Sequence, residues 1–478
     1  MRFESESQRM VNVQAGSRPP AAAHAIMRSM FKPFEHPGFW WDANEPGTRW
    51  PGTLSFDPVN GAVLRRTVAP DIGRLFGPSA SFDLIHGEAA NGLAITLVNC
   101  FERNHTDIFV NEVITGFHAD SADPLIASAA VVIENMGEWW GPGGIAHQPT
   151  DRRFDLGVRY ERPDAVTVHD DAIIRTTICS DARSSFERRR VSIEEEIRIE
   201  MVAKPLQPLS AFRRRAHVCQ DLIAVAALTL SNLDDFRIAP PSPNGTSKVF
   251  GHVYGVPIFK NPAEGWPHFL FRSTDVSERL PDMFSAWFAS AESLSVVRSL
   301  YMSGAYGKGF IELRFLALAQ AAEACHRRFY EGRDFYMDAA AYRDGILPKL
   351  QSAIPDSLDS SHKEALRSRL RFGNEFSLNK RLTMLFADHA EALAVVVPSP
   401  ESWIKPIRDF RNGFTHHPVA DDGAEKDKDK ILKCIYVLRI LIELCFLKAM
   451  GLDADTRRQL AGRCDHYRQI RERFFGGS

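Results

Sequence analysis

The sequence predicts an α+β protein with two main parts, a β-rich, antiparallel, sandwich-like N-terminal domain and an all-α helical bundle. Two observations lead to this fold class. Short runs of alternating apolar and polar residues, separated by Gly, Pro and Asn turns, fill the chain to about residue 209. From about Asp282 onward, apolar residues recur at helical spacing instead. The length of 478 residues allows roughly two to three domains.

Turn and strand patterns support the β-rich part, which we place at residues 31–209. Asn60-Gly61 and Asn91-Gly92 each separate two alternating runs, the strongest short signal for a hairpin. In VSIEEEIRIEM, residues 191–201, apolar side chains take every second position except at Glu195, and mostly charged ones take the others. Such a strand has one buried and one solvated face, and many short strands of this kind suggest a sandwich or a curved barrel.

The flanking and connecting segments differ in composition. Residues 1–30 are polar and aperiodic, so we expect them to be disordered or an over-extended start of translation. Residues 210–290 hold one helical stretch and a Pro/Gly-rich patch, which is either a short hairpin on the β-rich part or a linker. The helical bundle is placed at residues 291–478.

Two segments define the bundle. SSHKEALRSRLRF begins with a capping signature, Ser360 or Ser361 followed by Glu364. Residues 431–450, ILKCIYVLRILIELCFLKAM, are apolar on nearly every face and predict a central helix. Charged residues interrupt this run, so it contains no charge-free stretch long enough to span a membrane. DDGAEKDKDK, just before it, is expected to be a solvated loop.

Composition narrows the class of protein. The net charge is −2, with 58 basic and 60 acidic residues, so any contact with a polyanion must be a local patch. Seven scattered cysteines without a C-x-x-C pair argue against a disulfide framework or a zinc ribbon and fit a reducing cytoplasm. The N-terminus lacks the apolar core of a signal peptide, so we expect a cytoplasmic protein without membrane contact.

One stretch, RDFRNGFTHH at residues 408–417, concentrates polar side chains between two apolar helical patterns. On an ideal helix Arg411 and His416 point about 140° apart. They can meet if the helix ends or loosens near Gly413, or if two copies of the motif face each other across a dimer. Arg can hold a phosphodiester, and His can exchange protons with a ribose 2′-hydroxyl or a leaving oxygen. Asn412 could orient either group, and no acidic metal-binding cluster accompanies them, which favours metal-independent chemistry.

These residues carry a resemblance to a known family. RNGFTH, just before a long apolar helix, resembles the R-N-x-x-x-H signature of HEPN domains. RFLALAQAAEACHRRF and KRLTMLF resemble the ApeA-type branch of that superfamily. PFEHPGFWWDANEPGTRWPGTLSFDPVNGAVL and HGEAANGLAITLVNC resemble the N-terminal domain of ApeA anti-phage proteins. The resemblance covers nearly the whole chain after Phe31.

The resemblance implies a bacterial defence protein that acts by abortive infection. Its HEPN domain would be an endoribonuclease without cofactor or metal, leaving 2′,3′-cyclic phosphate and 5′-hydroxyl ends at a composite site of a homodimer. The substrate would be an RNA such as tRNA or mRNA, and a phage-derived trigger would act through the sensor-like N-terminal domain. Arg411 would stabilise the phosphate, His416 would be the acid and base, and Asn412 would assist.

Two further residues are supporting candidates. Relatives often carry an aromatic residue where this chain has His417, so two adjacent histidines compete for the role, and the spacing favours His416. Glu323, on an otherwise apolar helix, either supports Arg411 through a buried ion pair or forms a solvent-facing i,i+4 pair with Arg327.

Two rival hypotheses stay open. The HEPN bundle could bind RNA or a partner without catalysis, as some members of the superfamily do. The β-rich domain could instead be a ligand receptor that uses Trp40-Trp41 and Trp139-Trp140 as a platform, although such pairs more often belong to a core. The nuclease requires Arg411 and His416, whereas the receptor requires exposed tryptophans.

Overall fold

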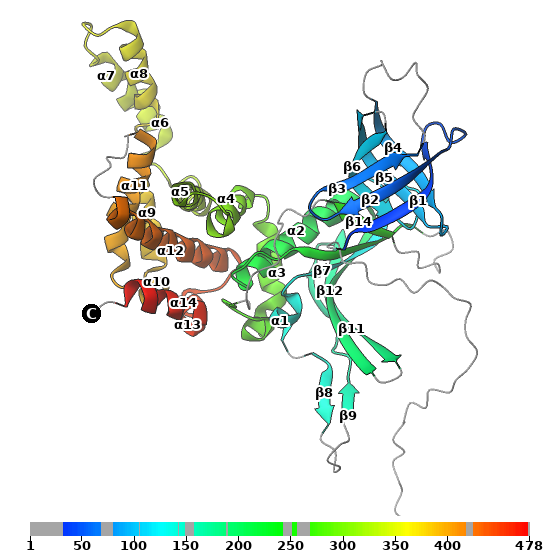
Figure 1. Cartoon of the computed structure of the whole chain (residues 1–478). Coiled ribbons are helices and arrows are strands. Elements are labelled where there is room, and N and C mark those ends of the chain that lie inside the picture. Colours follow the sequence, from blue (N-terminus) through cyan, green and yellow to red (C-terminus); the bar gives the residue numbers. More distant parts are fainter. Residues whose placement is uncertain are drawn as a thin grey trace, which may run out of the picture.

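The computed structural model describes residues 32–67, 80–104, 106–141, 143–148, 157–187, 190–241, 251–255, 268–416 and 424–476. The expectation for residues 1–30 lies outside these residues. A β-rich antiparallel region at residues 34–255 precedes a helical region at residues 273–475 (Figure 1). The predicted α+β fold class is therefore confirmed.

Among the described residues, twelve strands form one antiparallel sheet in the order β10-β11-β12-β7-β13-β14-β6-β3-β2-β1-β4-β5. Because β5 also pairs with β6, the last six strands of this order, from β6 to β5, close on themselves, and the sheet is barrel-like rather than two stacked layers. A separate pair is formed by β8 and β9. The strands are β1 (Phe34–Asp42), β2 (Trp50–Asp57), β3 (Gly61–Arg66), β4 (Ser81–Ala89), β5 (Ala94–Asn104), β6 (Asp107–Thr115), β7 (Leu125–Ile133), β8 (Ile145–Gln148), β9 (Gly157–Tyr160), β10 (Val166–Asp170), β11 (Ile174–Glu187), β12 (Arg190–Pro208), β13 (Leu233–Ala239) and β14 (Gly251–Gly255).

Both hairpins predicted from Asn-Gly pairs are present. Strands β2 and β3 flank Asn60-Gly61, and β4 and β5 flank Asn91-Gly92. The two glycines have φ angles of 84° and 78°, which only a residue without a Cβ adopts at little cost. The predicted alternating strand lies within β12, where Ile199 and Met201 are fully buried.

The segment between the two regions belongs partly to the sheet. Helix α2 (Leu209–Ala226) follows β12 directly, and its Phe212 and Leu222 are fully buried. From the Pro/Gly-rich patch, β14 pairs with both β13 and β6. Of the two arrangements expected for this patch, the strand pair on the sheet is the one that the structure has.

The helical elements are α1 (Met136–Trp140), η2 (Ser273–Arg279), α3 (Leu280–Ala289), α4 (Ser295–Tyr306), α5 (Ile311–Phe329), α6 (Ala339–Ala341), η3 (Tyr342–Ile346), α7 (Leu347–Ser352), α8 (Ser360–Arg371), α9 (Leu378–Asp388), α10 (Ala390–Val396), η4 (Pro400–Trp403), α11 (Ile404–His416), α12 (Ala424–Ala449), α13 (Ala454–Arg463), α14 (Asp465–Ile470) and η6 (Arg471–Phe475). Helix α12 is central, as predicted. It starts at Ala424, so the loop predicted before it is helical from that residue on. The predicted cap of α8 was also wrong, because the Asp359 carboxylate accepts the His362 N–H.

The helical region shares an apolar core with part of the sheet, while the barrel interior holds a second, separate core that includes Trp40 and Leu64. The shared core contains buried side chains of β7, β12 and β13 together with those of α2, α3 and α12. At their junction, Trp287 Nε1 donates to the Val218 carbonyl at 2.8 Å, and the indole meets the Phe446 ring edge-on at a centroid distance of 5.7 Å. A displacement of these strands would therefore disturb the packing of the central helix. Within the described ranges, no helix is long and apolar enough to cross a membrane.

Candidate active site

Helix α11 carries the polar motif and is anchored by its apolar face. Ile407 is fully buried, and the Phe410 and Phe414 rings meet Phe315 of α5 edge-on at centroid distances of 6.2 and 5.8 Å. These residues recur at helical spacing, so their packing fixes the rotation of α11 about its axis. The neighbouring position, Arg411, is thereby held at the margin of the core, with 32% of its side chain exposed.

The structure brings Arg411 and Glu323 together. Arg411 Nη2 lies 3.8 Å from Glu323 Oε2, and Arg411 Nη1 donates to Asn412 Oδ1 at 3.4 Å. Glu323 also pairs with Arg327 one turn further along α5, at 3.4 Å. Both contacts expected for Glu323 therefore exist, but with 23% of its side chain exposed the pair is not buried. A partly exposed pair adds at most about 1 kcal/mol, so its effect is to orient the guanidinium.

A chain of ion pairs continues from this contact into the protein. Arg327 lies 2.9 Å from Glu375, which lies 3.6 Å from Arg381, and Arg381 lies 3.2 Å from Asp334. Arg381 is fully buried. Neither Glu375 nor Arg381 stands out in the sequence, because a charged residue near the start of a helix is also common on surface helices.

His326, close to Glu323 on α5, is held in its neutral form. Arg381 Nη1 donates to its Nδ1 at 3.2 Å, which leaves the ring proton on Nε2, facing the Met384 sulfur at 3.4 Å. Burial and the nearby guanidinium of Arg381 lower the pKa of His326 to about 4. His326 therefore supports the packing of α5 and α9 and does not titrate near neutral pH.

Helix α11 does not end at Gly413 but continues to His416. On an ideal helix these five residues separate the Arg411 and His416 positions by about 7.5 Å along the axis and by about 140° around it. The expected break near Gly413 is thus absent, and the two-copy arrangement stays a prediction. His417 lies outside the described residues, so its supporting role is also untested.

Neither the tryptophan platform considered from the sequence nor the histidines of the β-rich region form a functional cluster among the described residues. Trp40 and Trp139 are fully buried and Trp41 is 5% exposed, so these tryptophans belong to the core. His86 and His118 stack at a centroid distance of 4.8 Å, and each Nε2 lies within 2.9 Å of a backbone carbonyl. Among the described side chains, no group of three or more His, Cys, Asp or Glu is arranged to hold a metal ion.

Comparison with known families accounts for most of the chain. The model of ApeA N-terminal domain 1 matches residues 35–287, which is more than half of the chain, and the model of the Apea-like HEPN domain matches residues 316–456. No curated protein and no solved structure matches the chain. The second match contains all of α11 and α12, and HEPN domains are usually ribonucleases that bind RNA and dimerise. The chain therefore belongs to the ApeA family of anti-phage effectors, with an ApeA N-terminal domain followed by an Apea-like HEPN domain.

Proposed function

We propose that this protein is a cytoplasmic anti-phage endoribonuclease that cleaves RNA without a metal ion, through Arg411, Asn412 and His416. His416 takes the proton of a ribose 2′-hydroxyl, which attacks the adjacent phosphorus. Arg411 binds the non-bridging oxygens, whose charge grows in the transition state. A histidine then returns a proton to the leaving 5′-oxygen, so the products are a 2′,3′-cyclic phosphate and a 5′-hydroxyl end.

The observation that supports this proposal best is the state of Arg411. Its guanidinium is oriented by Glu323 and Asn412 yet remains one-third exposed, within the matched HEPN domain. A phosphate can reach the exposed part of such a group from solvent. Arg408, one turn earlier, instead donates to the adjacent Asp409 through both Nε and Nη2, at 2.9 and 2.7 Å.

We propose further that the active site is a composite of two chains. Helix α11 is continuous, and the ideal helix places Arg411 and His416 on different sides of it. Two motifs that face each other across a two-fold axis would bring the Arg of one chain toward the His of the other. The expected particle is a homodimer, which light scattering on the purified chain measures directly.

The ApeA domain would restrain the nuclease until a phage-derived trigger arrives. The shared core supports this control, because β7, β12 and β13 pack in it together with α2, α3 and α12, so a rearrangement of these strands would disturb the packing of α12. A tRNA or mRNA would then be cut only in infected cells, which suits abortive infection.

Protection assays with matched variants test the proposal. Cells that express Arg411→Ala or His416→Ala at wild-type levels should lose protection against a phage that the wild-type chain resists. Arg408→Ala on the same helix and His362→Ala on α8 remove the same charge types outside the motif and should keep it. Protection that survives His416→Ala would support an RNA-binding or receptor function instead.

A further inference from the structure

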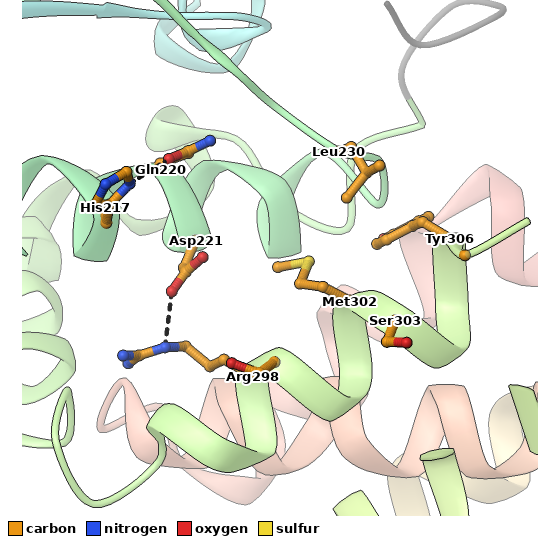
Figure 2. A pocket seen from close by; sticks show the side chains of 10 residues that line it. His217, Gln220, Asp221, Leu230, Arg298, Met302, Ser303 and Tyr306 are labelled. Atoms are coloured by element: carbon orange, nitrogen blue, oxygen red, sulfur yellow. Dashed lines mark hydrogen bonds and ion pairs between the residues drawn. The ribbon is translucent and has the colours of Figure 1, made fainter. Parts of the chain in front are cut away.

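A cavity of about 490 Å³ lies where α2 of the ApeA domain meets α4 of the helical region (Figure 2). It is unrelated to the Arg411 site. Asp221, Arg298 and His217 lie at one end of the cavity, and Leu230 and Tyr306 lie at the other, with Met302 between them. A pocket of this size, with a few polar groups at one end and apolar walls elsewhere, is typical of small-molecule sites.

The acidic group of the pocket is the carboxylate of Asp221, and one of its two oxygens pairs with Arg298. Asp221 Oδ2 lies 2.8 Å from Arg298 Nε, while Figure 2 shows the other carboxylate oxygen pointing away from that pair. With 29% of its side chain exposed, Asp221 is reached through the cavity. The apolar surroundings nevertheless raise its pKa to about 6, against the opposing effect of Arg298 and His217. The carboxylate therefore gains from any further cation or donor.

The donors around Asp221 are either used within the protein or shut off from the cavity. Arg298 is 7% exposed, its Nη2 donates to the Ala291 carbonyl at 2.7 Å, and its Nη1 is buried without a hydrogen-bond partner among the described residues. Gln220 Nε2 donates to the Ser231 carbonyl, so its Oε1 accepts from His217 Nδ1 at 2.9 Å, and His217 Nε2 is left as an acceptor.

Ser299, the exposed serine that lines the pocket next to Arg298, also has its donor in use. Ser299 Oγ donates to the Ser295 carbonyl at 3.1 Å, so only its lone pairs remain. The polar end thus presents acceptors to the cavity, which favours a donor-rich, positively charged ligand.

We propose that this pocket binds an organic amine, with its ammonium group at Asp221 and its apolar body against Leu230, Met302 and Tyr306. The ammonium donates to the free Asp221 oxygen, and His217 Nε2 and Ser299 Oγ are the remaining acceptors. An anionic ligand would meet a carboxylate at the same place and is disfavoured.

The apolar end of the pocket is tied to the central helix. Arg439 of α12 donates to the Tyr306 hydroxyl at 3.3 Å and to the Leu228 carbonyl at 3.1 Å. Leu228 is two residues before Leu230, so these two contacts of Arg439 adjoin the apolar wall of the pocket. An amine that orders this wall would therefore bias the position of α12. This consequence rests on the proposed nuclease, whereas binding itself does not.

Calorimetry on the full chain tests the site with phenethylamine, cadaverine and a capped lysine as probes, which separates a free amine from a lysine side chain. We expect one phenethylamine or cadaverine per chain and no binding of 2-phenylethanol, which lacks the charge. Asp221→Asn should weaken binding at least about tenfold, and Ser303→Trp, at the mouth, should abolish it without touching the ion pair. The matched controls are Asp83→Asn on β4 and Ser361→Trp on α8.

Three results would overturn parts of the proposal separately. Equal binding of the uncharged alcohol, or no amine binding at millimolar concentration, refutes the site. Capture of the capped lysine but not the free amines identifies a protein partner and refutes the small-molecule ligand. Amine binding that leaves RNA cleavage unchanged refutes the link to α12, while failure of the Arg411 and His416 tests refutes the nuclease and leaves the calorimetric result intact.

Discussion

Glu443 is a fully buried carboxylate in the middle of α12, and three donors point at it. The hydroxyls of Tyr301 and Tyr467 donate at 2.6 and 2.5 Å, and Arg439 Nε donates at 2.8 Å. Burial and the adjacent carboxylate raise the pKa of both tyrosines well above the ordinary value, so they remain donors. We predict that Glu443→Gln destabilises the fold, because an amide offers one acceptor oxygen and a nitrogen that itself donates.

The size of the effect follows from the geometry. Glu443→Gln leaves Arg439 charged and buried without its anion, and breaking a buried pair in this way costs about 3–5 kcal/mol. For a helical region of this size, each kcal/mol corresponds to about 2 to 4 °C in Tm. We therefore expect the Tm to fall by about 6 to 20 °C.

Thermal unfolding followed by circular dichroism at 222 nm measures this shift. The matched control is Glu391→Gln on α10, where the carboxylate is 74% exposed and the change should stay within about 0.5 kcal/mol. Arg439→Met combined with Glu443→Met should recover part of the loss, since it removes both buried charges. A Tm for Glu443→Gln within about 2 °C of the wild type would refute the assigned network.

Two further predictions concern other parts of the chain. A methyl group at Gly87 would overlap the fully buried Trp40 indole, so Gly87→Ala should lower the free energy of unfolding by about 1–3 kcal/mol in a urea titration, while Gly47→Ala, with open space around it, should not. The lowered pKa of His326 means that only the unfolded chain takes up this proton below about pH 6.5, so the free energy of unfolding should fall by about 2 kcal/mol between pH 7 and pH 5. His326→Gln, whose Oε1 can still accept from Arg381, should remove that part of the pH dependence; an unchanged slope would contradict the assignment.

Local signals explain which parts of the fold the sequence could predict. The hairpins at Asn60-Gly61 and Asn91-Gly92 and the alternation in β12 depend on neighbouring residues, and all three are present. Closure of the barrel depends on the pairing of β5 with β6 together with the path of four intervening strands, which no single stretch encodes. The cap of α8 was missed because Asp359 competes with two adjacent serines, and only the backbone geometry decides between them.

The candidate site was predictable as a motif but not as a geometry. The spacing of Arg411 and His416 is visible in the sequence, and so is the isolated charge of Glu323. The contact between Arg411 and Glu323 depends on how α5 and α11 cross, and the packing of Phe315 against Phe410 determines that crossing. The usable signals for the network around Glu443 were Arg439 and Glu443 themselves, two charges on a helix that is apolar on nearly every face.

A map of 5′-hydroxyl RNA ends in infected bacteria tests directly whether the chain cleaves RNA through Arg411 and His416. The phage is one against which the wild-type chain protects, and the compared chains are the wild type, Arg411→Ala and His416→Ala. We expect new 5′-hydroxyl ends, paired with 2′,3′-cyclic phosphates, in wild-type cells alone. The same ends in His416→Ala cells, or protection without any new ends, would contradict this prediction.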